Sequence, residues 1–219
     1  MEVYPLKSIN LERAIEFQFR LVDLIHRNFE GQEFLSGGDY GVLPGTGRPK
    51  YTEKVEKVIT EFFSTEAAAL VRGSGTGAIR AVLNRMLKNG ESILLHNAPI
   101  YPTTKITIEA MGLTPVMVDF NNLSEIDGQL LADVSLVLIQ HSRQKLEDNY
   151  NLGEVIKKLK ELRNDLLILV DDNYVVMKAE KIGAQLGADA SAFSMFKLLG
   201  PEGVGCVVGK KRLLIGLGR

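Results

Sequence analysis

The sequence has 219 residues, of which 45% are hydrophobic, and its 26 basic and 27 acidic side chains leave a formal net charge of −1. Such a chain can bury a sizeable core, and it lacks the blocks of like charge or long apolar runs typical of nucleic-acid-binding or membrane-spanning proteins. The start, MEVYPLKSIN, does not resemble a signal peptide, and the single cysteine, Cys206, has no partner for a disulfide, so we expect a cytoplasmic protein that binds a small molecule.

The first element expected along the chain is a helix over residues 11–29, where apolar side chains recur at near-helical spacing. Residues 34–51 are rich in glycine and proline, which predicts a long loop. Thr52 is then expected to cap a second helix. We accordingly divide the chain into an N-terminal helix and glycine-rich loop, residues 1–50, and a main domain, residues 51–219.

The main domain contains seven short apolar runs, mostly separated by helical patterns, at residues 67–72, 92–96, 114–119, 135–140, 166–171, 189–194 and 204–209. Continuous apolar runs suit strands that are buried on both faces. We therefore expect an α/β three-layer sandwich with a mostly parallel seven-stranded sheet. The last two runs are too close together for a helical crossover, so the seventh strand should be antiparallel to the sixth.

Chemically useful residues follow five of these expected strands. In an open parallel sheet, ligands bind outside the carboxyl ends of the strands, so these residues should converge. The glycine-rich turn GSGTG, residues 73–77, leads directly into a helix and offers backbone N–H groups and a positive dipole end to a phosphate. The other strands are followed by polar, aromatic and charged side chains: His96, Tyr101, His141, Arg143, Asp171, Asp172, Tyr174, Ser194 and Lys197.

Each feature alone has an ordinary structural interpretation. Glycines after a strand can serve only a tight turn, histidines are more often structural than catalytic, and lysines are mostly exposed. Together, however, a phosphate cradle, a carboxylate and a lysine fit pyridoxal 5′-phosphate. This cofactor needs a lysine to hold its aldehyde as a Schiff base, a carboxylate to keep its pyridine nitrogen protonated, and a helix terminus for its phosphate.

The order of these residues also resembles that of the fold-type I superfamily of pyridoxal-phosphate enzymes, which includes aminotransferases and cystathionine lyases. VDDNY, residues 170–174, looks like the superfamily's Asp-x-x-Tyr segment, and SMFK, residues 194–197, is similar to its Ser-x-Ser-Lys or Ser-x-Thr-Lys signature. YPTT, residues 101–104, resembles the Tyr-Gly-Gly-Thr of cystathionine lyases. Over nearly the whole chain, including GTGAIRA, QHSRQ and FKLLGPEGVG, the sequence resembles the bacterial YhfS-like family of aminotransferase-like proteins.

This resemblance implies roles for individual residues. Asp171, rather than Asp172, would face the pyridine nitrogen, and Tyr101 would stack on the ring. Lys197 would hold the aldehyde and then act as general base and acid at the substrate's α-carbon. The phosphate would be bound by Gly75, Thr76, Gly77 and Ser194. The candidates for the side of the cofactor's 3-hydroxyl are His141 and Tyr174. No metal is expected.

The sequence departs from the family pattern in two places. Phe196 replaces the hydroxyl residue that usually precedes the lysine, and the chain ends at Arg219, where the superfamily continues into the rest of the large domain and a small domain. That small domain normally supplies the arginine for the substrate carboxylate, so we expect an incomplete large domain with weak turnover. The resemblance also implies a homodimer in which residues 36–49 lie near the partner's active site.

Transamination of an amino acid or related amine is the first functional expectation. β- or γ-Elimination is the second, because YPTT resembles the lyases, and a fragment that binds the cofactor without catalysis is a further alternative. S-adenosylmethionine and nicotinamide proteins also place glycines after a first strand, but the acidic residue expected at the end of the second strand is absent here. A metal hydrolase is disfavoured because the three histidines are scattered along the chain.

Overall fold

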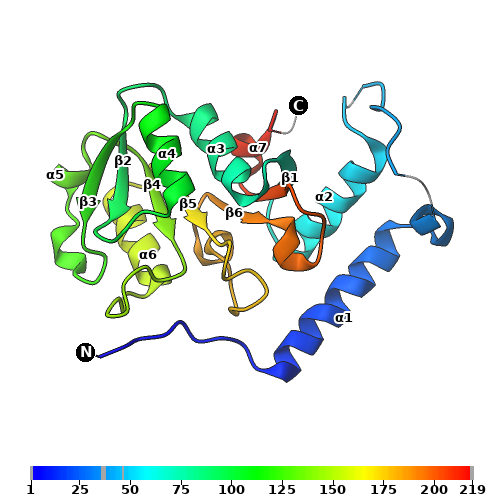
Figure 1. Ribbon diagram of the computed structural model, residues 1–219, viewed down its shortest axis with the longest axis horizontal. Helices are drawn as coiled ribbons and strands as arrows, with labels where there is room; N and C mark the ends of the chain where they lie inside the picture. The colour runs from blue at the N-terminus through cyan, green and yellow to red at the C-terminus, as the bar shows by residue number, and fades with distance from the viewer. Residues whose placement is uncertain (1, 36–37, 46, 218–219) are drawn as a thin grey trace.

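The computed structural model describes residues 2–35, 38–45 and 47–217, which are arranged as helices on both faces of one seven-stranded sheet (Figure 1). Each strand begins and ends within one residue of its expected range, so the α/β prediction is confirmed. The strands are β1 (Ala67–Arg72), β2 (Ser92–His96), β3 (Thr114–Val118), β4 (Val134–Gln140), β5 (Leu167–Asp171), β6 (Ala190–Ser194) and β7 (Val204–Gly209).

The order of strands across the sheet is β1-β7-β6-β5-β4-β2-β3. Strands β2 to β6 pair in parallel, and β7 runs antiparallel to β6, as expected. Strand β7 also pairs antiparallel with β1, which was not predicted. The connection between β6 and β7 contains only the short 3-10 helix η4 (Met195–Leu198) and a turn. Because β2, β4, β5 and β6 point the same way, their carboxyl ends lie along one edge of the sheet.

Three apolar clusters hold the layers together. One face of the sheet packs against α3 (Ser74–Met86), α4 (Pro102–Ala110) and α7 (Lys211–Leu214). The other face packs against α5 (Gly128–Leu131) and α6 (Leu152–Leu162) at one end and against the first two helices at the other. Side chains alternate between the faces within each strand: in β6, Ala192 belongs to the first cluster and Phe193 to the opposite one.

The N-terminal helix α1 (Leu11–Asn28) shares its core with the sheet. Its first turn is capped by Asn10, whose side chain accepts a hydrogen bond from the backbone N–H of Arg13. Phe17 and Leu24 on its inner face belong to the same cluster as Phe193 of β6 and the buried thiol Cys206 of β7. None of the helices in the described ranges is both long enough and apolar enough to cross a membrane.

The glycine-rich segment differs from the expected loop. It begins with a 3-10 helix, η1 (Gly31–Leu35), and ends where α2 (Lys50–Phe63) begins, two residues before the expected cap. The expectation that Thr52 caps this helix is wrong, because the carboxylate of Asp39 accepts hydrogen bonds from the backbone N–H groups of Tyr51 and Thr52. Residues 36, 37 and 46 of the segment expected near a partner lie outside the described residues, as does Arg219.

Two further 3-10 helices lie in connections between strands. They are η2 (Leu123–Glu125), before α5, and η3 (Gly183–Leu186), before β6. Gly183 of η3 has no room for a side chain, because a Cβ atom there would overlap Val170 of β5. The connection after β5 is therefore packed closely against the sheet, and this holds the residues that follow Asp171 in place.

Candidate functional site

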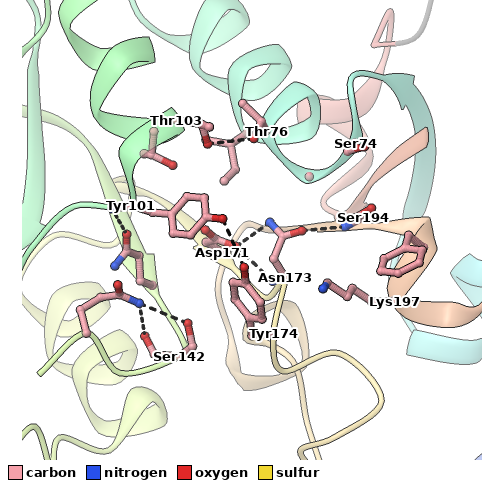
Figure 2. Close-up of a pocket in the computed structure, with 16 residues that line it drawn as sticks. Ser74, Thr76, Tyr101, Thr103, Ser142, Asp171, Asn173, Tyr174, Ser194 and Lys197 are labelled. Atoms are coloured by element: carbon pink, nitrogen blue, oxygen red, sulfur yellow. Dashed lines mark hydrogen bonds between the residues drawn. The ribbon is translucent and has the colours of Figure 1, made fainter. Parts of the chain in front are cut away.

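A cavity of about 180 Å³ opens at the carboxyl ends of β4, β5 and β6, beside the first turn of α3 (Figure 2). Seven of the nine expected cofactor-binding residues line it: Gly75, Thr76, Tyr101, Asp171, Tyr174, Ser194 and Lys197. The other two, Gly77 and His141, do not. Residues from five separate segments are thus brought together at the edge of the sheet that the topology predicts.

The first turn of α3 forms one end of the cavity. The backbone N–H groups of Gly75 and Thr76 have no acceptor within their own helix, as is general at helix N-termini. The hydroxyl groups of Thr76 and Thr103 are 2.9 Å apart and line the same end. Gly77 has a packing role, because a Cβ atom there would overlap the carbonyl oxygen of Arg72. The helix terminus and its hydroxyls form a site suited to an anion.

Asp171 lies at the centre of the cavity and is held by Asn173. Its Oδ1 atom accepts hydrogen bonds from the backbone N–H and the side-chain amide of Asn173, at 3.0 and 2.8 Å. Burial raises the pKa of Asp171, and the two hydrogen bonds from Asn173 act in the opposite direction. A carboxylate that is desolvated in this way gains from a cationic or N–H partner in the cavity.

The neighbouring acid, Asp172, belongs to a different environment. It is fully buried, and its Oδ1 atom is 2.6 Å from Nδ1 of His141, while Oδ2 accepts a hydrogen bond from the backbone N–H of Gly183. The structure thus distinguishes the two carboxylates: only Asp171 faces the cavity.

His141, a candidate for the cofactor's 3-hydroxyl side, does not line the cavity. It is buried against Asp172, whereas its neighbours Gln140 and Ser142 line the cavity. The backbone N–H of His141 bonds the carbonyl oxygen of Asp171, so the extended β4 pairing continues for one more residue. Successive side chains of an extended segment point to opposite faces, which directs His141 away from the cavity.

Lys197 and two tyrosines form the rim. The Nζ atom of Lys197 lies 4.7 Å from the centre of the Tyr174 ring and 5.2 Å from that of Phe196. The hydroxyls of Tyr101 and Tyr174 are 3.2 Å apart, and this hydrogen bond is the main cause of a raised pKa of Tyr101. Tyr101 is also fixed by its backbone N–H, which donates to Oε1 of Gln140 at 2.9 Å. The amine of Lys197 makes no hydrogen bond or salt bridge within the described residues.

Two other expected candidates have structural partners outside the cavity. Nε2 of His96 is 2.9 Å from Oδ1 of Asp148, and Nδ1 accepts a hydrogen bond from the backbone N–H of Phe120. Arg143 donates hydrogen bonds to the carbonyl oxygens of Asp148 and Tyr150. Within the described ranges, no group of three or more His, Cys, Asp or Glu side chains is placed to hold a metal ion.

Several residues that line the cavity were not predicted from the sequence, and Asn173 is the most important of them. Its side chain joins two strands, because its Oδ1 atom accepts a hydrogen bond of 2.9 Å from the backbone N–H of Ser194. The Asp-x-Asn spacing in VDDNY is a pattern of local side-chain to backbone bonding that could have identified it. The other missed polar residues are Thr103, Thr104, Gln140, Ser142 and Gln144, whereas Ser74 belongs to the glycine-rich turn expected at a phosphate.

The donor set of the cavity fits the expected cofactor. In Figure 2, Thr76 and Thr103 lie at one side, Ser142 and Tyr174 at the other, and Asp171 between them. N–H and hydroxyl donors for a phosphate, a desolvated carboxylate for a ring nitrogen and an amine for an aldehyde therefore share one cavity.

Comparisons with known proteins identify the family to which this chain belongs. Residues 48–217 match the model of the family described as aminotransferase class-V. The chain is 50% identical over 212 residues to the protein YhfS of Escherichia coli (strain K12), covering 95% of this chain and 58% of YhfS. A crystal structure described as that of the pyridoxal-5′-phosphate dependent protein YhfS superposes with a TM-score of 0.92 at 48% identity, over 98% of this chain and 59% of YhfS.

More distant structures share the fold. A carbon-sulfur lyase involved in aluminum resistance from Clostridium novyi NT gives a TM-score of 0.77 at 23% identity, over 93% of this chain and 54% of the lyase. An aspartate aminotransferase from Thermus thermophilus gives 0.63 at 18% identity, over 90% of this chain and 55% of the enzyme. Because a lyase and an aminotransferase both match, the fold does not distinguish these reactions. The chain spans less than two thirds of the length of each of these relatives.

Proposed function

This chain belongs to the class-V aminotransferase family, and we propose that it carries the cofactor-binding site of a pyridoxal-phosphate enzyme that acts on an amino acid. The observation that supports this most is the convergence of Lys197, Asp171 and the first turn of α3 on one cavity. When bound, pyridoxal phosphate supplies an aldehyde for the substrate's amino group and a ring that accepts electrons from the α-carbon.

Asp171 binds and orients the ring nitrogen in this proposal. Its carboxylate is half-buried, and burial raises its pKa, so a protonated ring nitrogen would be a favourable partner for the negative charge. Asn173 fixes the direction of the carboxylate through its two hydrogen bonds to Oδ1. The α3 terminus, Thr76 and Ser194 bind the phosphate at the other end of the cavity, with N–H and hydroxyl donors.

Lys197 moves the proton. Its amine lines the cavity and has no hydrogen-bond or salt-bridge partner in the described part of the chain, so it is free to act as general base and then as general acid at the α-carbon. Tyr174 lies beneath the amine and limits where it can point. Tyr101 stands across from Tyr174 and supplies the aromatic face expected to stack on the cofactor.

Transamination is the reaction we propose first, following the family. It needs one group that removes a proton from the α-carbon and returns it elsewhere on the same face, and Lys197 can do both. Elimination is the second candidate. This reaction benefits from a separate acid that protonates the leaving group, and the cavity contains one. The Tyr101 hydroxyl is such an acid: its hydrogen bond with Tyr174 raises its pKa, and it therefore retains its proton at neutral pH.

Exchange of the α-proton tests the proposal. The purified chain, supplied with pyridoxal phosphate, is incubated with a panel of amino acids in D₂O, and loss of the α-proton signal is followed by NMR. We expect exchange with at least one amino acid, and a rate lower by a factor of about 100 or more in Lys197→Ala, the usual contribution of a positioned general base. Lys157→Ala, on the exposed side of α6, is the matched control.

The products then separate the two reactions. Amino transfer to a 2-oxo acid indicates transamination, whereas release of ammonia with loss of the side-chain substituent indicates elimination. Tyr101→Phe keeps the aromatic ring and removes the acid, so it should impair elimination more than transamination. Absence of α-proton exchange with every amino acid, in a chain saturated with pyridoxal phosphate, would contradict the proposal.

A further inference from the structure

A second cavity, of about 340 Å³, adjoins the candidate site. Ser142 and Tyr174 line both cavities and therefore form a common wall. In Figure 2 these two residues lie on the side of the first cavity opposite Thr76 and Thr103, away from the anion-binding end of α3. A ligand held in the first cavity can extend past Ser142 and Tyr174 into the second.

The N-terminal segment, residues 3–8, forms the outer wall of this second cavity. Two backbone hydrogen bonds hold the segment: the N–H of Tyr4 donates to Leu146 at 3.1 Å, and the N–H of Ile9 donates to Lys178 at 2.8 Å. Lys7 lies between these two attachments and lines the cavity. The segment that precedes α1 passes beside the connections that follow β4 and β5 (Figure 1), and residues of all three line the second cavity.

The lining of the second cavity is basic. It includes four cationic side chains and no aspartate or glutamate: Lys7, Arg143, Lys145 and Lys178. Elsewhere lysines and arginines are commonly paired with acids, as Lys160 and Lys210 are with Asp189. No salt bridge in the described ranges involves any of the four lining cations. In a chain whose formal net charge is −1, this is a local excess of positive charge.

Hydrogen bonds within the protein hold the half-buried Arg143 without neutralising it. Its guanidinium donates to two backbone carbonyl oxygens, which are uncharged acceptors. Neither of the carboxylates bonded to lining residues pairs with one of the four cationic groups. Glu2 accepts a hydrogen bond from the Tyr4 hydroxyl at 2.6 Å, and the buried Asp148 accepts one from the backbone N–H of Lys145 and is paired with His96. The four cations therefore remain available to an anion that enters from the first cavity.

We propose, on the premise of the function given above, that the second cavity receives an anionic group on the substrate's side chain. The substrate is then an amino acid with a side-chain carboxylate, sulfonate or phosphate. Its α-carbon lies near Lys197 in the first cavity, and its side-chain anion passes Ser142 and Tyr174. Arg143 and Lys145 are half-buried, where Coulomb attraction is several times stronger than in water, while Lys7 and Lys178 are exposed. Unpaired cations around one cavity therefore favour an acidic ligand over a neutral one of equal shape.

Matched pairs of amino acids test this inference by equilibrium binding. Binding of L-aspartate, L-glutamate and O-phospho-L-serine to the chain loaded with pyridoxal phosphate is measured by calorimetry, against L-asparagine, L-glutamine and L-serine. We expect at least one acidic member to bind about tenfold or more tightly than its neutral partner, the ratio expected for one charge contact of about 1.4 kcal/mol. The Lys145→Met/Lys178→Met double variant should reduce this ratio to about twofold or less, whereas Lys157→Met should leave it unchanged.

The visible absorption of bound pyridoxal phosphate allows the cofactor proposal and the basic-cavity proposal to be tested separately. Equal binding of acidic and neutral partners, or no binding of either, by a chain that retains this absorption would overturn the basic-cavity proposal and leave the cofactor proposal standing. A preference for acidic partners that persists in the Lys145→Met/Lys178→Met variant would overturn it as well. A chain that never acquires the absorption would contradict the cofactor proposal. The acidic preference and its loss in the double variant would then be measured on the cofactor-free chain.

Discussion

The side-chain amide of Asn173 donates a hydrogen bond of 2.8 Å to Oδ1 of Asp171, the one carboxylate among the described residues that lines the candidate site (Figure 2). The oxygen of the same amide accepts a hydrogen bond from the backbone N–H of Ser194, at the end of the next strand. Asn173 therefore couples the position of the ring-binding acid to the strand end that leads to Lys197.

Substitution of Asn173 should change the pH dependence of the reaction. The side-chain and backbone hydrogen bonds of Asn173 lower the pKa of Asp171 against the larger effect of burial. Asn173→Ala removes the side-chain bond and keeps the backbone bond, so it should raise that pKa further. The carboxylate form is present above the pKa and is lost as the pH falls through it. The acidic limb of the rate profile for α-proton exchange should therefore move to higher pH, whereas Asn164→Ala, at an exposed position, should leave the profile unchanged. An unshifted acidic limb in Asn173→Ala would contradict this role.

Substitution of the two adjacent aspartates should have different effects. Asp171→Asn removes the negative charge at the ring nitrogen, and we expect α-proton exchange to slow by a factor of about 100 or more, with a smaller loss of cofactor affinity. Asp172→Asn disrupts the buried contact with His141, and a loss of about 1–3 kcal/mol in the free energy of unfolding is expected for such a site. Exchange rates and denaturant titrations of both variants check this, and equal effects on catalysis would show that the two roles are assigned wrongly.

Gly75 should tolerate no side chain. A Cβ atom at this position would overlap the Asn173 amide, which cannot move freely because it is bonded to Asp171 and Ser194. We expect Gly75→Ala to fold but to bind pyridoxal phosphate about tenfold more weakly or worse, as the loss of one charged hydrogen bond of about 1.5–3 kcal/mol would produce. Gly128→Ala, where a Cβ atom meets nothing within 4 Å, is the control. Unchanged affinity in Gly75→Ala, measured by absorption titration, would contradict the close fit.

The strands and the edge of the sheet that carries the site were predictable, because continuous apolar runs and glycine turns are local properties of the sequence. The face toward which each residue points was harder to predict. His141 and Asp172 look as suitable for chemistry as their neighbours, but the continued extended backbone after β4 turns His141 away from the cavity and leaves it buried against Asp172. Likewise, Thr52 looks like a helix cap, and only the tertiary structure brings Asp39 to that position.

The assembly of the protein remains a prediction from the family resemblance. We expect a homodimer, and light scattering of the purified chain should give twice its mass of 24.2 kDa. The family resemblance implies that the cofactor sites lie at the subunit boundary. Phe196, which lines the cavity, and Leu199, three residues further along the chain, are large apolar side chains that are exposed and that a partner would cover. A monomer at all concentrations used for the binding measurements would contradict this expectation.

The central claim is that Lys197 holds pyridoxal phosphate in the cavity shared with Asp171. The most direct test is to incubate the purified chain with the cofactor, reduce it with borohydride, digest it, and locate the covalently attached cofactor by mass spectrometry, with Lys197→Ala treated in parallel. We expect the attachment at Lys197 alone and none above background in the variant. Attachment at another lysine, or none at all in a chain that has bound the cofactor, would contradict the assignment of this site.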